Sequence, residues 1–266
     1  MEDIVIYELE KMNLKGAVVI DGFPSVGLVS TIVGNYIINT LNLKQIGVVD
    51  SPTFPSLSIV RGSEPLSPVR IYAGRTTTSV EGIEEPQNIV VFISEFVPPP
   101  ALVRPIANAI MDWFEENKCD IIISPEGLGQ EQPLLLDEGE DNRELPVFGI
   151  GSTQRVRSLI EANNILPLTN GAITGVTATL LTTGKRREID VLCLLTEASE
   201  QYPDARAAGK MLEIIDKVAL LKEIDPTPLF KEAEIIEEQI KKLQKQAKPG
   251  MQSQAEKQSA PPGMYG

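Results

Sequence analysis

The chain has 266 residues, 42% of them hydrophobic, and a formal net charge of −13 at pH 7. This length suits one large domain or two small ones, and the negative charge argues against binding to nucleic acid or to an anionic membrane. The sequence has no histidine and only two cysteines, which argues against Ser-His-Asp or Cys-His catalysis, a disulfide framework and a zinc site, so we expect no metal or cofactor.

The N-terminus is acidic, beginning Met1-Glu2-Asp3, and its first apolar run is short, unlike a signal peptide. No segment approaches the roughly 20 consecutive apolar residues of a membrane span. Cys119 follows a helix-like stretch and Cys193 lies in a strand-like run, so both are interpreted as buried, unreactive thiols. We therefore expect a cytoplasmic protein.

Strand patterns and helix patterns alternate along residues 17–195. Strands are expected at residues 17–20, 47–49, 57–59, 70–73, 88–93, 120–123, 147–150 and 190–195. Helices are expected at residues 26–41, with Ser25 as N-cap, at 101–117, at 154–163 and from near Gly175. Residues 131–145 are acidic and turn-rich, typical of an exposed excursion. The alternation predicts an α/β fold of three layers, with a largely parallel central sheet flanked by helices.

Three glycine-rich turns follow predicted strands, at residues 21–27, 124–129 and 170–175. The first occupies a position where many α/β proteins bind anions, but it lacks the Gly-Lys-Ser/Thr ending of a P-loop, and Pro24 removes an N–H donor. We interpret these turns as sites of tight packing. Glu95 and Glu126 also follow strands, where carboxylates can be catalytic, but no partner base or metal cluster accompanies them. They are interpreted as surface or interface carboxylates.

The last part of the chain predicts a helical hairpin over residues 204–247, after a core domain of residues 1–203. Asp204 is a plausible cap for the first helix, and Asp225-Pro226 forces a break before the second. The second helix, at 227–247, has an apolar seam with coiled-coil spacing, made of Leu229, Ala233, Ile236, Ile240 and Leu243. This seam either packs on the chain's own domain or joins subunits of an oligomer.

Residues 248–266 contain little apolar surface, so we expect a disordered tail. The tail ends in Met264-Tyr265-Gly266, where an apolar side chain, a tyrosine and a free carboxylate can fill a partner's pocket together. This tripeptide resembles the C-terminal hydrophobic–Tyr–any-residue motif of proteasome activators. The motif implies insertion between neighbouring subunits of the proteasome α-ring.

A broader resemblance covers residues 18–240. Residues 19–29, 170–175 and 197–204, with the helix pair interrupted at 224–226, are similar to the archaeal proteasome assembly chaperone homologue family. That resemblance implies a single α/β domain, a homo-oligomer and binding to proteasome subunits without catalysis. It also implies that Tyr265 packs in a groove of the α-ring while the Gly266 carboxylate pairs with a lysine of the core particle.

The sequence therefore predicts an ATP-independent proteasome-binding protein, either an assembly chaperone homologue or an activator. Two alternatives stay open. One is an α/β enzyme of nucleoside-phosphorylase-like type, acting at the carboxyl ends of the strands, which a metabolite would stabilise thermally. The other is an oligomeric scaffold that uses the coil at 227–247 and carries an idle tail.

Overall fold

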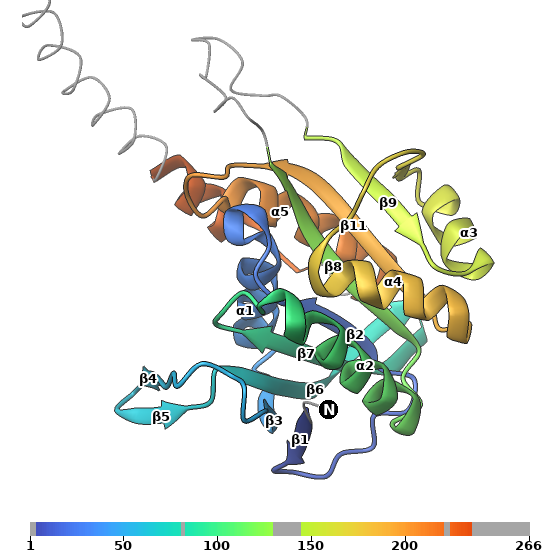
Figure 1. Cartoon of the computed structure of the whole chain (residues 1–266). Coiled ribbons are helices and arrows are strands. Elements are labelled where there is room, and N and C mark those ends of the chain that lie inside the picture. The colour runs from blue at the N-terminus through green and yellow to red at the C-terminus, as the bar shows by residue number, and fades with distance from the viewer. Residues whose placement is uncertain (1–3, 81–82, 130–144, 221–223, 236–266) are drawn as a thin grey trace, which may run out of the picture.

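The computed structural model describes residues 4–80, 83–129, 145–220 and 224–235. Helices cover both faces of a central nine-stranded sheet (Figure 1), with strand order β1-β3-β6-β7-β2-β8-β11-β9-β10. The strands are β1 (Val5–Glu8), β2 (Val18–Gly22), β3 (Lys44–Asp50), β6 (Val69–Val80), β7 (Ile83–Ser94), β8 (Ile121–Gly129), β9 (Val147–Gly151), β10 (Leu166–Pro167) and β11 (Val191–Ala198). A separate small hairpin joins β4 (Ile59–Arg61) to β5 (Glu64–Leu66).

The middle of the sheet is parallel. Strand β2 pairs in parallel with β7 and β8, and β8 pairs in parallel with β11. The next pairings outward, of β6 with β7 and β3, of β3 with β1 and of β11 with β9, are antiparallel, and the edge strand β10 pairs in parallel with β9. Strands β6 and β7 must pair antiparallel, since only two residues separate them in the sequence and a parallel pair needs a much longer connection. The predicted α/β fold is thus confirmed, with a sheet that is parallel at its centre and mixed overall.

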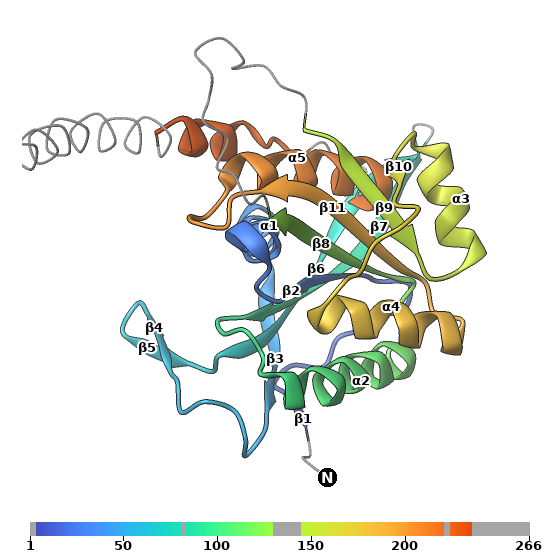
Figure 2. The ribbon, with the colours of Figure 1, turned by 45° about the horizontal axis from the view of Figure 1, so that its top comes forward.

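The helices form two outer layers (Figure 2). Helices α1 (Val29–Thr40), α3 (Gln154–Ala162) and α5 (Ala205–Ile215) lie on one face, and α2 (Pro100–Glu116) and α4 (Gly175–Arg187) lie on the other. Successive residues of β2 serve the two layers in turn, because side chains alternate along a strand: Val18 and Ile20 pack towards α1 and α5, whereas Val19 packs towards α2 and α4.

Helix α1 begins three residues later than the sequence predicts. A 3₁₀ turn occupies Val26–Leu28, and Leu28, not Ser25, is the N-cap residue of α1. The turn contains two left-handed residues, Gly27 with φ of 62° and Leu28 with φ of 52°. The hydroxyl of Ser25 instead accepts a hydrogen bond from the amide of Ser30 at 3.2 Å. The chain therefore turns sharply before it becomes helical.

Residues 125–129, where the sequence predicts a turn, belong to strand β8. This stretch pairs with β11 as far as Gly129 opposite Ala198. On the other side, β8 pairs with β2 only as far as Ile123. Pro125 is tolerated because beyond Ile123 only one side of the strand is paired. The predicted excursion at 131–145 lies, except for its last residue, outside the described residues.

Candidate functional site

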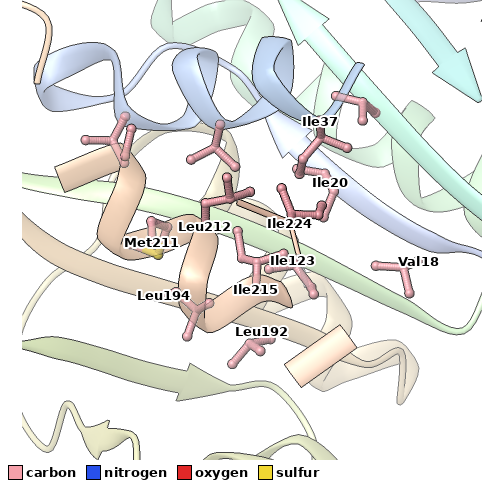
Figure 3. Close-up of a cluster of buried hydrophobic side chains, with 14 of the residues drawn as sticks. Val18, Ile20, Ile37, Ile123, Leu192, Leu194, Met211, Leu212, Ile215 and Ile224 are labelled. Atoms are coloured by element: carbon pink, nitrogen blue, oxygen red, sulfur yellow. The ribbon is translucent and has the colours of Figure 1, made fainter. Parts of the chain in front are cut away.

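The base of the predicted C-terminal hairpin is fixed to the core. Asp204 caps α5, as predicted, because its Oδ1 accepts the amide of Ala207 at 2.9 Å. Helix α5 packs against α1, and its side chains Met211, Leu212 and Ile215 are fully buried between α1 and the sheet (Figure 3). This helix is therefore part of the main hydrophobic core.

A second helix begins at Thr227, where the sequence predicts one, and its described part reaches residue 235. The carboxylate of Asp225 accepts the amide of Thr227 at 2.9 Å. Hydrogen bonding to the side chain of Thr227, and then to its amide, lowers the pKa of Asp225. The carbonyl of Asp225 accepts the hydroxyl of Tyr36, on α1, at 2.6 Å. The break before the helix is thus tied directly to α1.

The two C-terminal helices also contact each other. A Cβ atom on Gly209 of α5 would lie 2.8 Å from Cε1 of Phe230. The absence of a side chain at Gly209 therefore lets the Phe230 ring pack against α5. Leu229 and Ala233 are buried by the chain itself, with 4% of each exposed. These are the first two residues of the predicted seam.

The remaining predicted binding residues lie outside the described residues. They are Ile236, Ile240 and Leu243 of the seam, and Met264, Tyr265 and Gly266 of the tail. The role of the seam between subunits and the role of the tail at a partner therefore stay predictions.

Two of the segments that carry the family resemblance meet in space. The carbonyl of Gly27 accepts the amide of Asp204 at 2.8 Å, and a Cβ on Gly27 would lie 3.0 Å from the Cβ atoms of both Ala198 and Asp204. A Cβ on Gly127 of β8 would lie only 2.2 Å from the carbonyl oxygen of Val26. Gly27 and Gly127 thus allow three chain segments to approach closely, which is the tight packing that the sequence predicts for residues 21–27 and 124–129. The third predicted turn differs, because a Cβ on Gly171 would meet only the Leu168 side chain, at 3.3 Å, and one on Gly175 would meet nothing within 4 Å.

Glu95, one of the two carboxylates considered from the sequence, forms ion pairs with two arginines. Its Oε1 accepts a bond from the fully buried Arg70 at 2.5 Å and another from Arg61 at 3.2 Å. The guanidinium of Arg70 also donates to the carbonyl of Ser67 at 2.6 Å. This group links the end of β7 to the β4–β5 hairpin.

Glu126 lies in a different environment, on the α2 and α4 face of the sheet. Its Oε1 is 2.5 Å from the hydroxyl of Thr177, on α4, and that hydroxyl is 3.2 Å from Oδ2 of the buried Asp21. Burial raises the pKa of Glu126 to about 8 and also raises the pKa of Asp21. Sequence reasoning missed Asp21, Ser124 and Thr177 as neighbours of Glu126. The sequence does offer a signal for two of them, because Asp21 directly follows the apolar run Val18–Ile20 and Ser124 directly follows the apolar run Ile121–Ile123.

Two features are absent from residues 4–80, 83–129, 145–220 and 224–235. No helix in them is long and apolar enough to cross a membrane. No three acidic, cysteine or histidine side chains in them lie together in a way that could hold a metal ion. The thiols of Cys119 and Cys193 are free, and burial raises the pKa of Cys119 to about 12 and raises that of Cys193 as well.

Comparison with known sequences gives a family match over most of the chain. A family model described as PAC2 matches residues 19–244. An uncharacterized protein of Methanocaldococcus jannaschii is 26% identical over 247 residues, which cover 92% of this chain and 93% of that protein.

Comparison with solved structures identifies similar folds of nearly the same length. PbaA of Pyrococcus furiosus, an archaeal homologue of proteasome-assembly chaperone, is 29% identical with a TM-score of 0.76, over 97% of this chain and all of that one. PbaB of the same organism, an archaeal proteasome activator, has a TM-score of 0.76 at 21% identity, over 92% of this chain and all of that one. At that identity the likeness to PbaB shows the fold alone.

Proposed function

The chain belongs to the PAC2 family, and on that premise we propose that it is a proteasome-binding protein of the cytoplasm. It acts without ATP, as an assembly chaperone or as an activator of the core particle, and it binds rather than catalyses. The observation that carries the proposal is the match to PbaA, at 29% identity over 97% of the chain. A likeness of that extent includes the core, the α5 region and the start of the second helix.

The contact with the partner is assigned to the C-terminal tripeptide Met264-Tyr265-Gly266. Tyr265 fills a groove between α-ring subunits, and the Gly266 carboxylate pairs with a lysine there. A flexible segment of the length of residues 248–266 would have an r.m.s. reach of about 25 Å. Its helical base supports this role, because Tyr36 and the Gly209–Phe230 contact hold residues 224–235 against the body.

Binding strength comes from several tails acting together. The protein is proposed to be a homo-oligomer, in which Ile236, Ile240 and Leu243 continue the seam into a subunit contact. Each subunit then presents one tail to the ring. Weak single contacts add, because the second tail binds at a high effective concentration once the first is seated.

The test measures binding to the core particle and activation of the core particle separately. Purified protein is tested for co-precipitation of a core particle and for acceleration of peptide hydrolysis by a latent core particle. Removing residues 264–266 should abolish both effects and leave the thermal unfolding curve unchanged. Tyr265→Ala should cost about 2 kcal/mol per tail if the ring is a buried anchor.

Tyr7→Ala is the matched control, because Tyr7 is an exposed tyrosine on the edge strand β1. It should bind the core particle like the unaltered protein. Unchanged co-precipitation by the truncated chain would refute the tail as the docking element. If neither the unaltered protein nor the truncated one binds the core particle, the proposed function itself is refuted.

A further inference from the structure

A cavity of about 430 Å³ opens at the carboxyl ends of the parallel strands in the middle of the sheet. Its walls are residues 23–26 after β2, residues 97–98 after β7, residues 126–128 of β8 and residues 172–177 around the start of α4. The chain leaves β2 towards α1 on one face and leaves β7 towards α2 on the other. Such a divergence leaves a crevice in which α/β proteins commonly bind ligands.

The walls of the cavity are mainly apolar, with Phe23, Val26, Val97, Val103 and Leu128 among them. Among the described residues that line it, Glu126 is the one ionisable side chain. A largely apolar chamber with a few polar groups, here Ser25, Thr174 and Thr177 beside Glu126, is the usual construction of a small-molecule site.

The hydrogen bonds beneath the cavity require a proton on a carboxyl group. Thr177 has one hydroxyl proton, yet its Oγ1 lies 2.5 Å from Glu126 and 3.2 Å from Asp21. Asp21 already accepts the hydroxyl of Ser124 at 3.0 Å and the amide of Phe23 at 3.1 Å. Both contacts of Thr177 can be hydrogen bonds only if one carboxyl group supplies the second proton. Glu126 and Asp21 therefore share a proton through Thr177.

The groups that face this pair are acidic or neutral. Asp21 comes from β2 and Thr177 from α4. Burial raises the pKa of the Cys193 thiol on β11, and the two nearby carboxyl groups, Glu126 and Asp21, raise it further. No lysine or arginine is among the described residues that line the cavity. A buried carboxylate needs a proton or a cation as a partner, and here the proton takes that place.

We propose that this cavity binds a small monovalent organic cation, an ammonium or guanidinium group on a short apolar chain, with Glu126 as its counter-ion. The cationic group replaces the shared proton, and the apolar chain contacts the side chains after β2 and β7. The first turn of α4 also faces the cavity, through residues 175–177. Since a helix N-terminus favours anions, binding of an anion is the rival outcome that the experiment must separate.

Binding of such a cation is linked to proton release. Because Glu126 has a pKa of about 8, it is mostly protonated at pH 7 and must lose its proton when the cation enters. Affinity should therefore rise by about tenfold between pH 7 and pH 9, as the ionised fraction of Glu126 increases. A guanidinium probe suits this test because it stays charged over the whole range.

The experiment uses the full chain and three probes of similar shape. n-Butylguanidinium is a cation, n-butylurea is its neutral planar counterpart, and pentanoate is an anion. Titration calorimetry in buffers of different ionisation enthalpy measures both affinity and proton release. Butylguanidinium should bind at least tenfold more tightly than butylurea, with release of a proton at pH 7. Tighter binding of pentanoate, equal binding of all three, or no binding of butylguanidinium overturns the proposal.

Two variants locate the site. Glu126→Gln keeps the size of the side chain and should remove both cation binding and its pH dependence, whereas the same substitution at Glu161, on the exposed face of α3, should leave both intact. Val97→Lys offers an independent check, because Val97 lines the cavity and is 71% exposed. The added ammonium should weaken butylguanidinium binding by tenfold or more without disturbing the core. Undiminished binding by a folded Val97→Lys protein would place the ligand elsewhere and overturn the assignment.

Discussion

Gly127→Ala tests whether the close approach of β8 to the turn after β2 is essential. The added methyl carbon would lie 2.2 Å from the carbonyl oxygen of Val26 and 3.0 Å from Cβ of Ala198. Carbon atoms in contact normally stay about 3.5–4.0 Å apart. The obstacle is backbone, so no side-chain rotation can relieve it, and the turn at Val26–Leu28 would have to move by about 1 Å.

The cost follows from where that turn is anchored. Gly27 is itself held between Ala198 and Asp204, and β8 is fixed on its other side by pairing with β11. Overpacking of a site that cannot expand costs about 3 kcal/mol. For a chain of this size the midpoint of thermal unfolding should fall by roughly 6–12 °C.

Urea unfolding followed by circular dichroism, with thermal unfolding as a second measure, gives the change in free energy. Gly171→Ala is the matched control, because its new methyl would meet only the end of the Leu168 side chain, at 3.3 Å. That variant should stay within about 1 kcal/mol of the unaltered protein. A Gly127→Ala protein within about 0.5 kcal/mol of the unaltered chain would refute the packing argument.

Three further predictions concern single side chains. Because the pKa of Glu126 in the folded state, about 8, exceeds its ordinary value of 4.5, the folded protein holds more protons between these values, so stability should fall as pH rises from about 5 to 8. Glu126→Gln should flatten this part of the curve, and an unchanged pH profile in urea unfolding would contradict it. Tyr36→Phe removes the bond to the carbonyl of Asp225 and should cost about 1 kcal/mol, with faster amide exchange in residues 224–235 than in α2; exchange that stays equally slow would argue against this anchor. Thr153→Ala removes the N-cap bond to the amide of Val156 and should cost about 1 kcal/mol, whereas Thr153→Ser should retain most of the stability in the same thermal assay.

The strongly patterned elements follow from the sequence. Helix α2 begins within one residue of the predicted start, and the apolar residues that recur along it at helical spacing are buried, namely Ile106, Ile110, Trp113 and Phe114. The buried strands β2 and β7 appear as continuous apolar runs, because helices cover both of their faces. The shift in the start of α1 could not be predicted, since it depends on Gly27 meeting residues far along the chain. The extension of β8 through Pro125 likewise depends on its partner β11.

The candidate sites divide in the same way. The tail motif is a local signal, so it can be read without a structure, and its action depends on a partner. The environment of Glu126 is not local, because Asp21, Ser124 and Thr177 come from three different elements and converge only in the fold. Glu95 resembles Glu126 in sequence, because each follows a predicted strand, yet Glu95 forms an ion pair with Arg70. Only the three-dimensional arrangement distinguishes the two carboxylates.

The strand order has a consequence for the way the chain folds. Strand β9 follows β8 in the sequence, but β11 lies between them in the sheet. During synthesis β9 and α3 leave the ribosome well before β11. Until β11 is made, β9 has no strand to link it to β8, and the edge of β8 that β11 will cover stays unpaired. Contacts between distant parts of a chain form slowly, and unpaired strand edges attract other chains. Pairing of residues 191–198 with β8 and β9 should therefore complete the middle of the sheet. It should also cover the strand edge through which the nascent chain can aggregate.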